Sequence, residues 1–452
     1  MAFEDDLHLV PSNWSTITLG ELCDSGGGDI QTGPFGSQLH SADYVPVGVP
    51  SIMPTNISVE GIQAEGIARI TFRDAERLQK YRVRDGDIVY SRRGDVEKCV
   101  LVTQNENGWL CGTGCLRVRL GRSSPVDSNF VHAYLSSPPV RAWVVRHSVG
   151  ATMPNLNTSI LRSLPIAVPP SDEMQDIGAI WASLIKKTNH LASTNQTLES
   201  IARAIFKSWF VDFDPVRGKA EGREPEGIDA ATAALFSSVM EDTEKGEVPK
   251  GWSIKRLTDF IEINPSRTLP KGKEAPYLEM ANAPTVGPRP AKWAARLPMS
   301  GCRFQNGDTL LAKITPCLEN GKTAFVDFLG KDDIGWGSTE FVVLAPKGAL
   351  PPVFGYLLAR HSDFRAFAIQ SMSGTSGRQR IQVDQLAKFE FPIADDAVYS
   401  AFAEIVEPLF AAISHNDDQG KTLAELRDTL LPRLISGKLR LLEAEKMVEA
   451  VL

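Results

Sequence analysis

Residues 172–209, DEMQDIGAIWASLIKKTNHLASTNQTLESIARAIFKSW, decide the fold of this chain. Apolar side chains recur along the stretch at seven-residue intervals, and two more lie between them on the same side: Ile177, Leu184, Leu191, Leu198 and Ile205, with Ile180 and Ile201. Such a stripe predicts a long helix that packs against a second long helix. The stretch contains no Pro, and at the helical rise per residue it would span roughly 57 Å.

A second stripe lies at a constant offset of 225 residues. Its members align without a gap with the first stripe: Phe402, Ile405, Leu409, Leu423, Leu426 and Leu430. We expect both stripes to be buried at the seam between the two helices. The second stretch differs from the first in carrying Pro408 and Gly420, so we expect a bent or shorter partner helix there. Asn416 places a polar residue on the seam, where it either sets the register or is partly solvated.

The rest of the chain repeats with the two stripes. The segment VPSNWSTITLGEL (10–22) returns as VPKGWSIKRLTDF (248–260), and DGDIVYSR (85–92) returns as NGDTLLAK (306–313). Further pairs follow in the same order, with offsets between 221 and 238, and they include the polar loops at 148–158 and 371–382. The sequence therefore predicts a two-copy internal repeat, in which each copy is a head followed by a long helix.

Each head mixes short strands, short helices and many turns, which indicates an α+β fold. The order of these signals predicts the following segments: head 1 at 1–170, a long helix at 171–211, a linker with one short helix at 212–247, head 2 at 248–395, a second long helix at 396–436, and a tail at 437–452. A repeat of this kind produces a pseudo-twofold arrangement, so we expect the long helices to pair antiparallel as a coiled coil. Two similar heads at the ends of such a rod would suit DNA, which presents equivalent groove faces every 34–36 Å.

Composition is that of a globular protein with two to four domains, with 42% hydrophobic and 23% charged residues. No apolar run looks long enough to span a membrane, and the acidic N-terminus does not resemble a signal peptide. The six Cys form no C-x-x-C pair, so we expect reduced thiols and no metal site. The net charge is −7, yet residues 63–162 carry 15 basic and 9 acidic residues, and residues 248–395 carry 19 and 14. Basic heads in an acidic frame fit a DNA-binding protein, although ordinary charge scatter would give the same numbers.

Known catalytic motifs are missing from the sequence. The segment ending in Gly321-Lys322-Thr323 has Pro316 where a phosphate-binding loop needs Gly, and no H-E-x-x-H or Cys/His cluster occurs. Asp212 and Asp214 read as helix-end and linker residues rather than metal ligands. The favoured interpretation is a non-catalytic DNA-recognition and assembly protein without a cofactor. Two alternatives stay open: a stand-alone methyltransferase or nuclease with a divergent site, and a coiled-coil scaffold that never touches DNA.

The chain resembles the specificity subunits of type I restriction-modification systems over nearly its full length. The resemblance is carried by GPFGSQL (33–39), IFKSWFVDFDPVRGKAEGREPEG (205–227), VPKGW (248–252), GTSGRQRI (374–381) and LLPRLISGKL (430–439). It implies two target recognition domains, an antiparallel coiled coil, and two bound methyltransferase subunits that recruit restriction/translocase subunits. It also implies S-adenosylmethionine, ATP and Mg²⁺ chemistry in those partners only, and a place on DNA in the cytoplasm of a bacterium or archaeon, in defence against foreign DNA.

Candidate DNA contacts are polar or basic residues in exposed loops and on one helix. They are Ser37, Gln38, Arg92, Arg93 and Arg146 in head 1, and Lys313, Thr315, Arg378, Gln379 and Arg380 in head 2. For Arg378–Arg380 a structural role, holding the loop in place, is an equal alternative. We further expect Trp209 and Phe210, with the exposed flanks of the coiled coil, to dock the methyltransferase subunits.

Overall fold

The computed structural model describes residues 11, 13–150, 153–225, 227–270, 272–375, 377–439 and 441–449. The repeat match that begins at Val10, and parts of the matched polar loops at Ala151, Thr152 and Ser376, lie outside these residues. The chain forms two compact units, Met1–Leu191 with Gln419–Leu452 (unit 1) and Ala192–Asp418 (unit 2). Each unit contains one head and half of each long helix.

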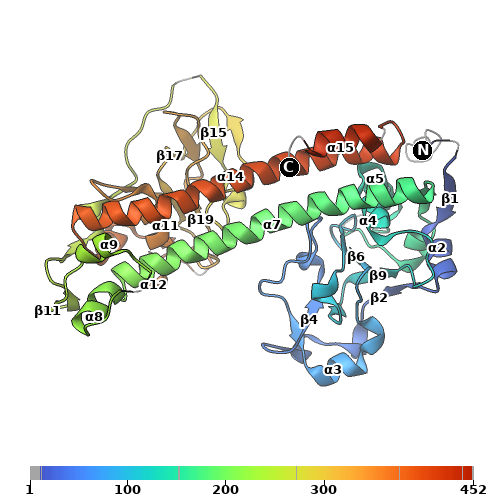
Figure 1. The fold of residues 1–452 in the computed structure, drawn as a ribbon, viewed down its shortest axis with the longest axis horizontal. Coiled ribbons are helices and arrows are strands. Elements are labelled where there is room, and N and C mark those ends of the chain that lie inside the picture. Colours follow the sequence, from blue (N-terminus) through green and yellow to red (C-terminus); the bar gives the residue numbers. More distant parts are fainter. Residues whose placement is uncertain are drawn as a thin grey trace. The chain divides into compact units, whose positions relative to one another are not determined.

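The two long helices have equal length. Helix α7 (Ser171–Phe210) and helix α14 (Asp396–Ile435) each contain 40 residues and keep the offset of 225 at both ends (Figure 1). The expectation of a shorter partner helix is therefore wrong. Helix α14 continues through Pro408 and Gly420, and Pro408 is exposed, so the carbonyl that loses its hydrogen-bond donor can be solvated.

In unit 1 the predicted seam is buried. Ile177, Leu184, Leu191, Leu423 and Leu430 lie in the core, and Ile180 and Leu426 are half-buried against it. Arg427 of α14 lies over the ring of Trp181 of α7, at 5.7 Å from the ring centroid. Trp181 in turn donates to His132 of the head (3.0 Å), and burial lowers the pKa of His132 to about 4.

In unit 2 the buried stripe of α7 differs from the predicted one. Phe402 is buried, but Leu198, Ile205, Ile405 and Leu409 are only half-buried, and Ile201 is 43% exposed. The buried positions on this half of α7 are Asn195, Glu199, Ala202, Phe206, Trp209 and Phe210. The prediction of Ile201 as a core residue is thus wrong.

Paired polar groups explain the shift of the stripe. Asn195 donates to Asp417 and accepts from Asn416, both at 2.8 Å, and Glu199 accepts from the Tyr356 hydroxyl at 2.8 Å. A polar side chain can be buried at low cost when its hydrogen bonds are made, and the periodicity of apolar residues does not reveal this. Within unit 2, Asn195 meets Asn416 and Trp209 meets Phe402, so the helices run antiparallel there.

Among its described residues, head 1 contains two four-stranded sheets and five short helices. The sheets have the orders β2-β9-β6-β7 and β3-β5-β4-β8, and β1 pairs with β10 where the head joins α7. The strands are β1 (Ser15–Thr18), β2 (Asp29–Thr32), β3 (Tyr44–Val45), β4 (Val49–Ile52), β5 (Arg69–Ile70), β6 (Ile88–Ser91), β7 (Cys99–Leu101), β8 (Leu110–Cys111), β9 (Cys115–Arg119) and β10 (Pro165–Val168). The helices are α2 (Leu19–Gly26), α3 (Phe72–Arg77), α4 (Ser128–Ser136), α5 (Pro138–His147) and α6 (Thr158–Arg162). Thr71 caps α3 by accepting from Asp74 N, and α4 and α5 are separated at Ser137, before Pro138.

Head 2 repeats this topology. Its sheet β14-β21-β18-β19 has the order of β2-β9-β6-β7, β13 pairs with β24 as β1 pairs with β10, and the core of its other sheet, β16-β15-β20, matches β5-β4-β8. The strands are β13 (Ser253–Arg256), β14 (Ile261–Ile263), β15 (Ala275–Leu278), β16 (Ala294–Arg296), β17 (Cys302–Phe304), β18 (Thr309–Ala312), β19 (Thr323–Phe325), β20 (Gly335–Gly337), β21 (Phe341–Pro346), β22 (Met372–Ser373), β23 (Arg380–Ile381) and β24 (Glu390–Ile393). The helices are α10 (Leu257–Phe260), α11 (Pro352–Arg360), α12 (Ser362–Gln370) and α13 (Val383–Leu386). The predicted α+β repeat is confirmed at the level of strand order.

The segment between α7 and head 2 is more ordered than a linker. It contains α8 (Asp214–Ala220), α9 (Ala230–Ala234) and the hairpin of β11 (Met240–Thr243) and β12 (Gly246–Pro249), of which only one short helix was expected. At the other end of the chain, α15 (Leu441–Glu449) places Ala444 and Val448 in the core of unit 1.

An 18-residue window of α14 reaches a mean hydropathy of 1.4, so this helix could cross a membrane by length and composition alone, contrary to expectation. One such helix is weak evidence, because the packed helix of a globular protein passes the same test. Here Phe402, Val406 and Phe410 of α14 are buried in the core of unit 2.

Candidate nucleic-acid interface

In head 1, four loops form one continuous surface at the ends of the strands. They are residues 33–38, 92–94, 112–114 and 153–156, which we call the four-loop face of head 1. Strand β6 ends at Ser91, so the turn that follows it leaves the sheet here. The sequence marked three of these loops separately, and the sheet brings them together.

Backbone hydrogen bonds join these loops in a row. The Arg92 N–H donates to Gly114 O (2.7 Å), the Leu156 N–H donates to Arg92 O (2.9 Å), and the Gly94 N–H donates to Pro154 O (3.3 Å). At the other side, the Thr113 hydroxyl donates to Pro34 O (3.0 Å). The face is therefore a fixed surface rather than four independent loops.

Head 2 makes the same three backbone bonds at the corresponding residues. The Lys313 N–H donates to Glu340 O (2.8 Å), the Ile381 N–H donates to Lys313 O (2.8 Å), and the Thr315 N–H donates to Gln379 O (3.0 Å). The four-loop face of head 2 accordingly comprises residues 264–267, 313–315, 338–340 and 377–381. Most of the predicted DNA contacts of both heads thus lie on one equivalent surface.

In head 1 the predicted side chains lie at both ends of this face. Arg93 is exposed and Arg92 half-buried, and Ser37 is exposed in the short 3-10 turn Gly36–Gln38. Gln38 is half-buried and accepts from the Tyr81 hydroxyl at 2.7 Å, so it fixes the loop. Arg146 is exposed on α5, outside the four-loop face.

In head 2 the three residues Arg378–Arg380 have different roles. Arg378 is exposed at the tip of the loop. Arg380 makes a bidentate ion pair with Glu340, with contacts from 2.8 to 3.1 Å, and this pairing raises the pKa of Arg380 and lowers the pKa of Glu340. The main chain of Gln379 pairs with that of Thr315, and its N–H also donates to the Thr315 hydroxyl (3.2 Å). Arg380 and Gln379 therefore hold the loop, and Arg378 presents a charge to solvent.

A cleft of about 370 Å³ adjoins the four-loop face of head 2. Its walls include Lys313, Thr339, Arg303 and Arg267. Arg267 is buried in a bidentate ion pair with Asp308 (2.6 and 2.7 Å), and burial raises the pKa of this carboxyl to about 6 although Arg267 opposes the shift. The basic residues Arg267 and Arg303 were not singled out from the sequence, because only the sheet brings them beside Lys313.

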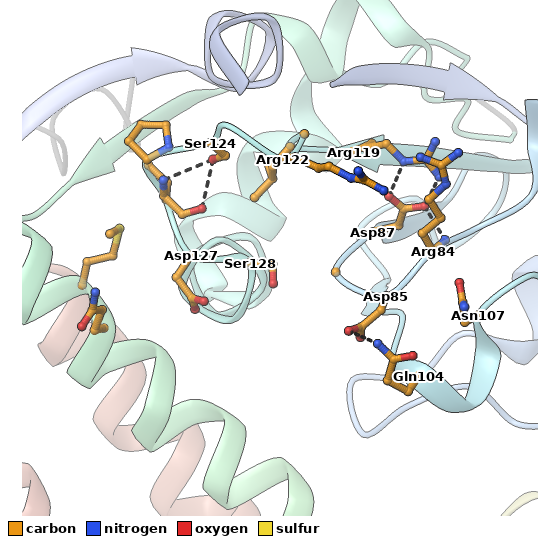
Figure 2. Close-up of a pocket in the computed structure, with 17 residues that line it drawn as sticks. Arg84, Asp85, Asp87, Gln104, Asn107, Arg119, Arg122, Ser124, Asp127 and Ser128 are labelled. Carbon is orange, nitrogen blue, oxygen red and sulfur yellow. Dashed lines mark hydrogen bonds and ion pairs between the residues drawn. The ribbon is translucent and has the colours of Figure 1, made fainter. Parts of the chain in front are cut away.

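A second cavity, of about 960 Å³, lies in unit 1 at the opposite end of β6 (Figure 2). Asp87 pairs with Arg119 (2.6 Å), Asp85 accepts from Gln104 (2.6 Å), and Asp127 accepts from the first N–H groups of α4. The carboxylates in this cavity are therefore occupied in holding the fold.

Trp209 and Phe210 do not form a docking surface. Their exposed fractions are 3% and 0%, and their rings pack against Phe402, Phe236 and Trp252 in the core of unit 2. Phe236, which follows α9, packs on the Trp209 ring, and Trp252, at the start of head 2, packs on the Phe210 ring. The prediction that they dock a partner is wrong for the side chains themselves.

Among the described residues, no group of three or more His, Cys, Asp or Glu side chains could hold a metal ion. Four of the six cysteines are buried, and burial raises the pKa of Cys23 and Cys111 to about 12, so these thiols are poor nucleophiles. The exposed and half-buried cations on the four-loop faces can bind an anionic polymer.

Comparison with known proteins agrees with this geometry. The family model "Type I restriction modification DNA specificity domain" matches residues 11–201. The HindI specificity subunit of Haemophilus influenzae is 24% identical over 417 residues, which cover 81% of this chain and 89% of that protein. The MjaIX specificity subunit of Methanocaldococcus jannaschii is 23% identical over 327 residues, or 70% of each chain. The crystal structure of a type I S subunit from M. genitalium superposes with a TM-score of 0.54 at 14% identity, covering 93% of this chain and 96% of that one, so the two share a fold.

Proposed function

Because the chain belongs to the family of type I restriction-modification specificity subunits, we propose that its two four-loop faces each read one half of an asymmetric, bipartite DNA site. Specificity subunits are non-catalytic, and the role of this chain is recognition.

The observation that carries the proposal is the recurrence of one face in both heads. Three backbone hydrogen bonds recur at equivalent positions, and each face presents at least one exposed or half-buried cation, Arg92 and Arg93 in head 1 and Lys313 and Arg378 in head 2. Cations hold phosphates, and Arg, Gln and Ser side chains read base edges. Since the side chains differ between the heads, the two half-sites should differ in sequence.

The long helices would set the distance between the half-sites. Each has 40 residues, which corresponds to about 60 Å of helix. Successive equivalent groove faces of DNA are about 34–36 Å apart, so a spacer of roughly one turn would be left unread. Deleting one heptad from each of the two helices should then change the preferred spacing between the half-sites and leave the sequences of both half-sites unchanged.

The partners would be two methyltransferase subunits, which recruit restriction/translocase subunits, and S-adenosylmethionine, ATP and Mg²⁺ would act in those partners. Since Trp209 and Phe210 are buried, the docking surface would be the exposed flanks of α7 and α14. The proteins would assemble on DNA in the cytoplasm.

Mapping methylated adenines genome-wide, in a host with and without this chain, tests the proposal. We expect a bipartite motif that is lost on deletion of the chain and restored by its expression. In the same strain, Arg93→Gln should alter only one half of the motif and Arg378→Gln only the other. An effect of either substitution on both halves would contradict the assignment of one face to each half-site.

A further inference from the structure

Phe35 is one of two exposed apolar side chains on the four-loop face of head 1, the other being Met153. Its ring is 57% exposed and belongs to none of the apolar clusters of the described residues. It lies in the loop 33–38, beside the hydroxyl of Thr113 and in the same face as Arg92 and Arg93. We propose that this ring packs against the bases of the half-site that head 1 reads. The inference rests on the proposed function.

The backbone around Phe35 is locked so that the ring points away from the protein core. A Cβ atom at Gly33 would lie 2.0 Å from Gly112 O, so only glycine lets these two strand-end loops approach so closely. On the other side of Phe35, Gly36 has φ +60, a left-handed conformation that favours glycine. The two glycines therefore allow the backbone path on which Phe35, one of the two residues between them, is exposed.

Side-chain hydrogen bonds lock the same loop a second time. Gln38 Oε1 accepts from the Phe35 N–H (3.3 Å) and from the Tyr81 hydroxyl (2.7 Å), and Arg77 donates to Gln38 O (3.0 Å). Thr113 holds Pro34 O from the opposite side. An exposed aromatic ring on so restrained a loop loses little conformational freedom when it meets a partner.

DNA fits this ring better than an apolar protein surface does. Besides Met153, the face carries the cations Arg92 and Arg93 and the hydroxyl groups of Ser37 and Thr113, which suit phosphates and base edges rather than a wholly apolar partner. Rigid aromatic and apolar side chains in such settings contact thymine methyl groups or insert at a base step. Phe35 and Phe72 are the two phenylalanines of the described chain that are largely exposed, and Phe72, at the start of α3, lies outside the four loops.

Head 2 has no counterpart of the Phe35 ring. At the corresponding point β14 is followed by residues 264–267, NPSR, and Arg267 there is turned into its ion pair with Asp308. The two heads therefore differ in this loop, and loss of the Phe35 ring should affect only the half-site that head 1 reads.

The experiment measures sequence discrimination by the full chain in complex with its methyltransferase, on duplex DNA with every single-base change in each half-site. We expect Phe35→Ala to reduce the discrimination between the correct and the changed base by about tenfold, at one or two adjacent positions of one half-site. One mismatched base pair typically weakens specific binding by about this factor. The slope of log affinity against log salt should not change, because no charge is removed. The thermal unfolding midpoint should also stay the same, because the ring is exposed.

Phe72→Ala is the matched control, because it removes another exposed phenylalanine of head 1 that lies outside the four-loop face. Unchanged discrimination in Phe35→Ala, a loss spread over both half-sites, or an equal loss in Phe72→Ala would each overturn the inference. If the wild-type complex itself shows no bipartite preference, the proposed function fails instead, and the two failures are therefore distinguishable.

Discussion

Neighbouring arginines on the loop of head 2 should differ sharply in their effect on DNA binding. Arg378 is exposed, whereas Arg380 is neutralised by a bidentate pair with Glu340. Only an unneutralised cation releases a counterion when it meets a phosphate. Arg378→Gln should therefore weaken the salt dependence of binding, and loss of the Arg380–Glu340 pair as a unit should not.

The magnitude follows from the cations that the two faces offer. Arg92, Arg93, Lys313 and Arg378 give a slope of log affinity against log salt of about −3.6, at about −0.9 for each phosphate contact. Arg378→Gln should bring the slope to about −2.7. Between 50 and 200 mM salt, the wild-type affinity should then fall about 150-fold through these contacts, and that of the variant about 40-fold.

Releasing Arg380 from its ion pair should change the slope of log affinity against log salt in the opposite direction. Glu340→Gln frees the guanidinium and should make the slope steeper by up to about 0.9. The double variant Arg380→Gln with Glu340→Gln removes both charges and should return the slope to the wild-type value. The assay is fluorescence anisotropy of a labelled random-sequence duplex, titrated with the complex at five salt concentrations.

The slopes of these variants, compared with one another, test whether the ion pair neutralises Arg380. Equal slopes for Arg378→Gln and the double variant would refute the reasoning, because Arg378 and Arg380 would then contribute alike to the salt dependence. A Glu340→Gln slope below that of the wild type in magnitude would have the same consequence. Circular dichroism should show the same helix content in all variants, since these side chains are exposed or half-buried.

Three further predictions concern stability and assembly. Phe206→Ala should destabilise the protein by about 3–5 kcal/mol in urea unfolding, whereas Ile201→Ala should cost less than about 1 kcal/mol, because Phe206 is buried and Ile201 is 43% exposed. Arg267→Ala should cost about 3 kcal/mol at pH 7.5 and less at pH 5. Burial already raises the pKa of Asp308 to about 6, and the pKa rises further when Arg267 is lost, so at pH 5 the carboxyl is protonated in the folded state and leaves no unpaired charge. Equal shifts of the urea midpoint at the two pH values would refute this. Because Trp209 is buried, Trp209→Ala should lower the unfolding midpoint and weaken methyltransferase binding together. A loss of methyltransferase binding in a pull-down at an unchanged unfolding midpoint would show instead that the Trp209 ring contacts the partner.

The long helices were predictable because their signal is local and repeated. Two stripes at a constant offset of 225 residues gave helices that start and end within two residues of the observed ones. The change of buried face in unit 2 was not predictable in this way. It depends on Glu199 meeting Tyr356 and on Asn195 meeting Asn416, and such pairs are made across the fold.

The candidate site was predictable in its parts and not in its assembly. Composition marked the turn 91–94 and the polar loop 148–158 separately, since charged and Gly-rich segments favour exposed turns. Their contact arises from sheet pairing between distant segments. The same reason explains why the pairing of Arg380 with Glu340, 40 residues apart, was not visible, and why Phe35 was not singled out from the sequence.

The recurrent bonds also explain how one scaffold can serve two different half-sites. All three hydrogen bonds that join the loops in both heads run from backbone to backbone. These three bonds do not depend on the side chains of the residues that make them, and those side chains differ between the heads: Arg92 corresponds to Lys313, Gly94 to Thr315, and Pro154 to Gln379. A surface whose geometry is held by the main chain leaves its side chains free to vary with the bases that they contact. The asymmetry of the DNA site then follows from substitutions that leave the fold of each head unchanged.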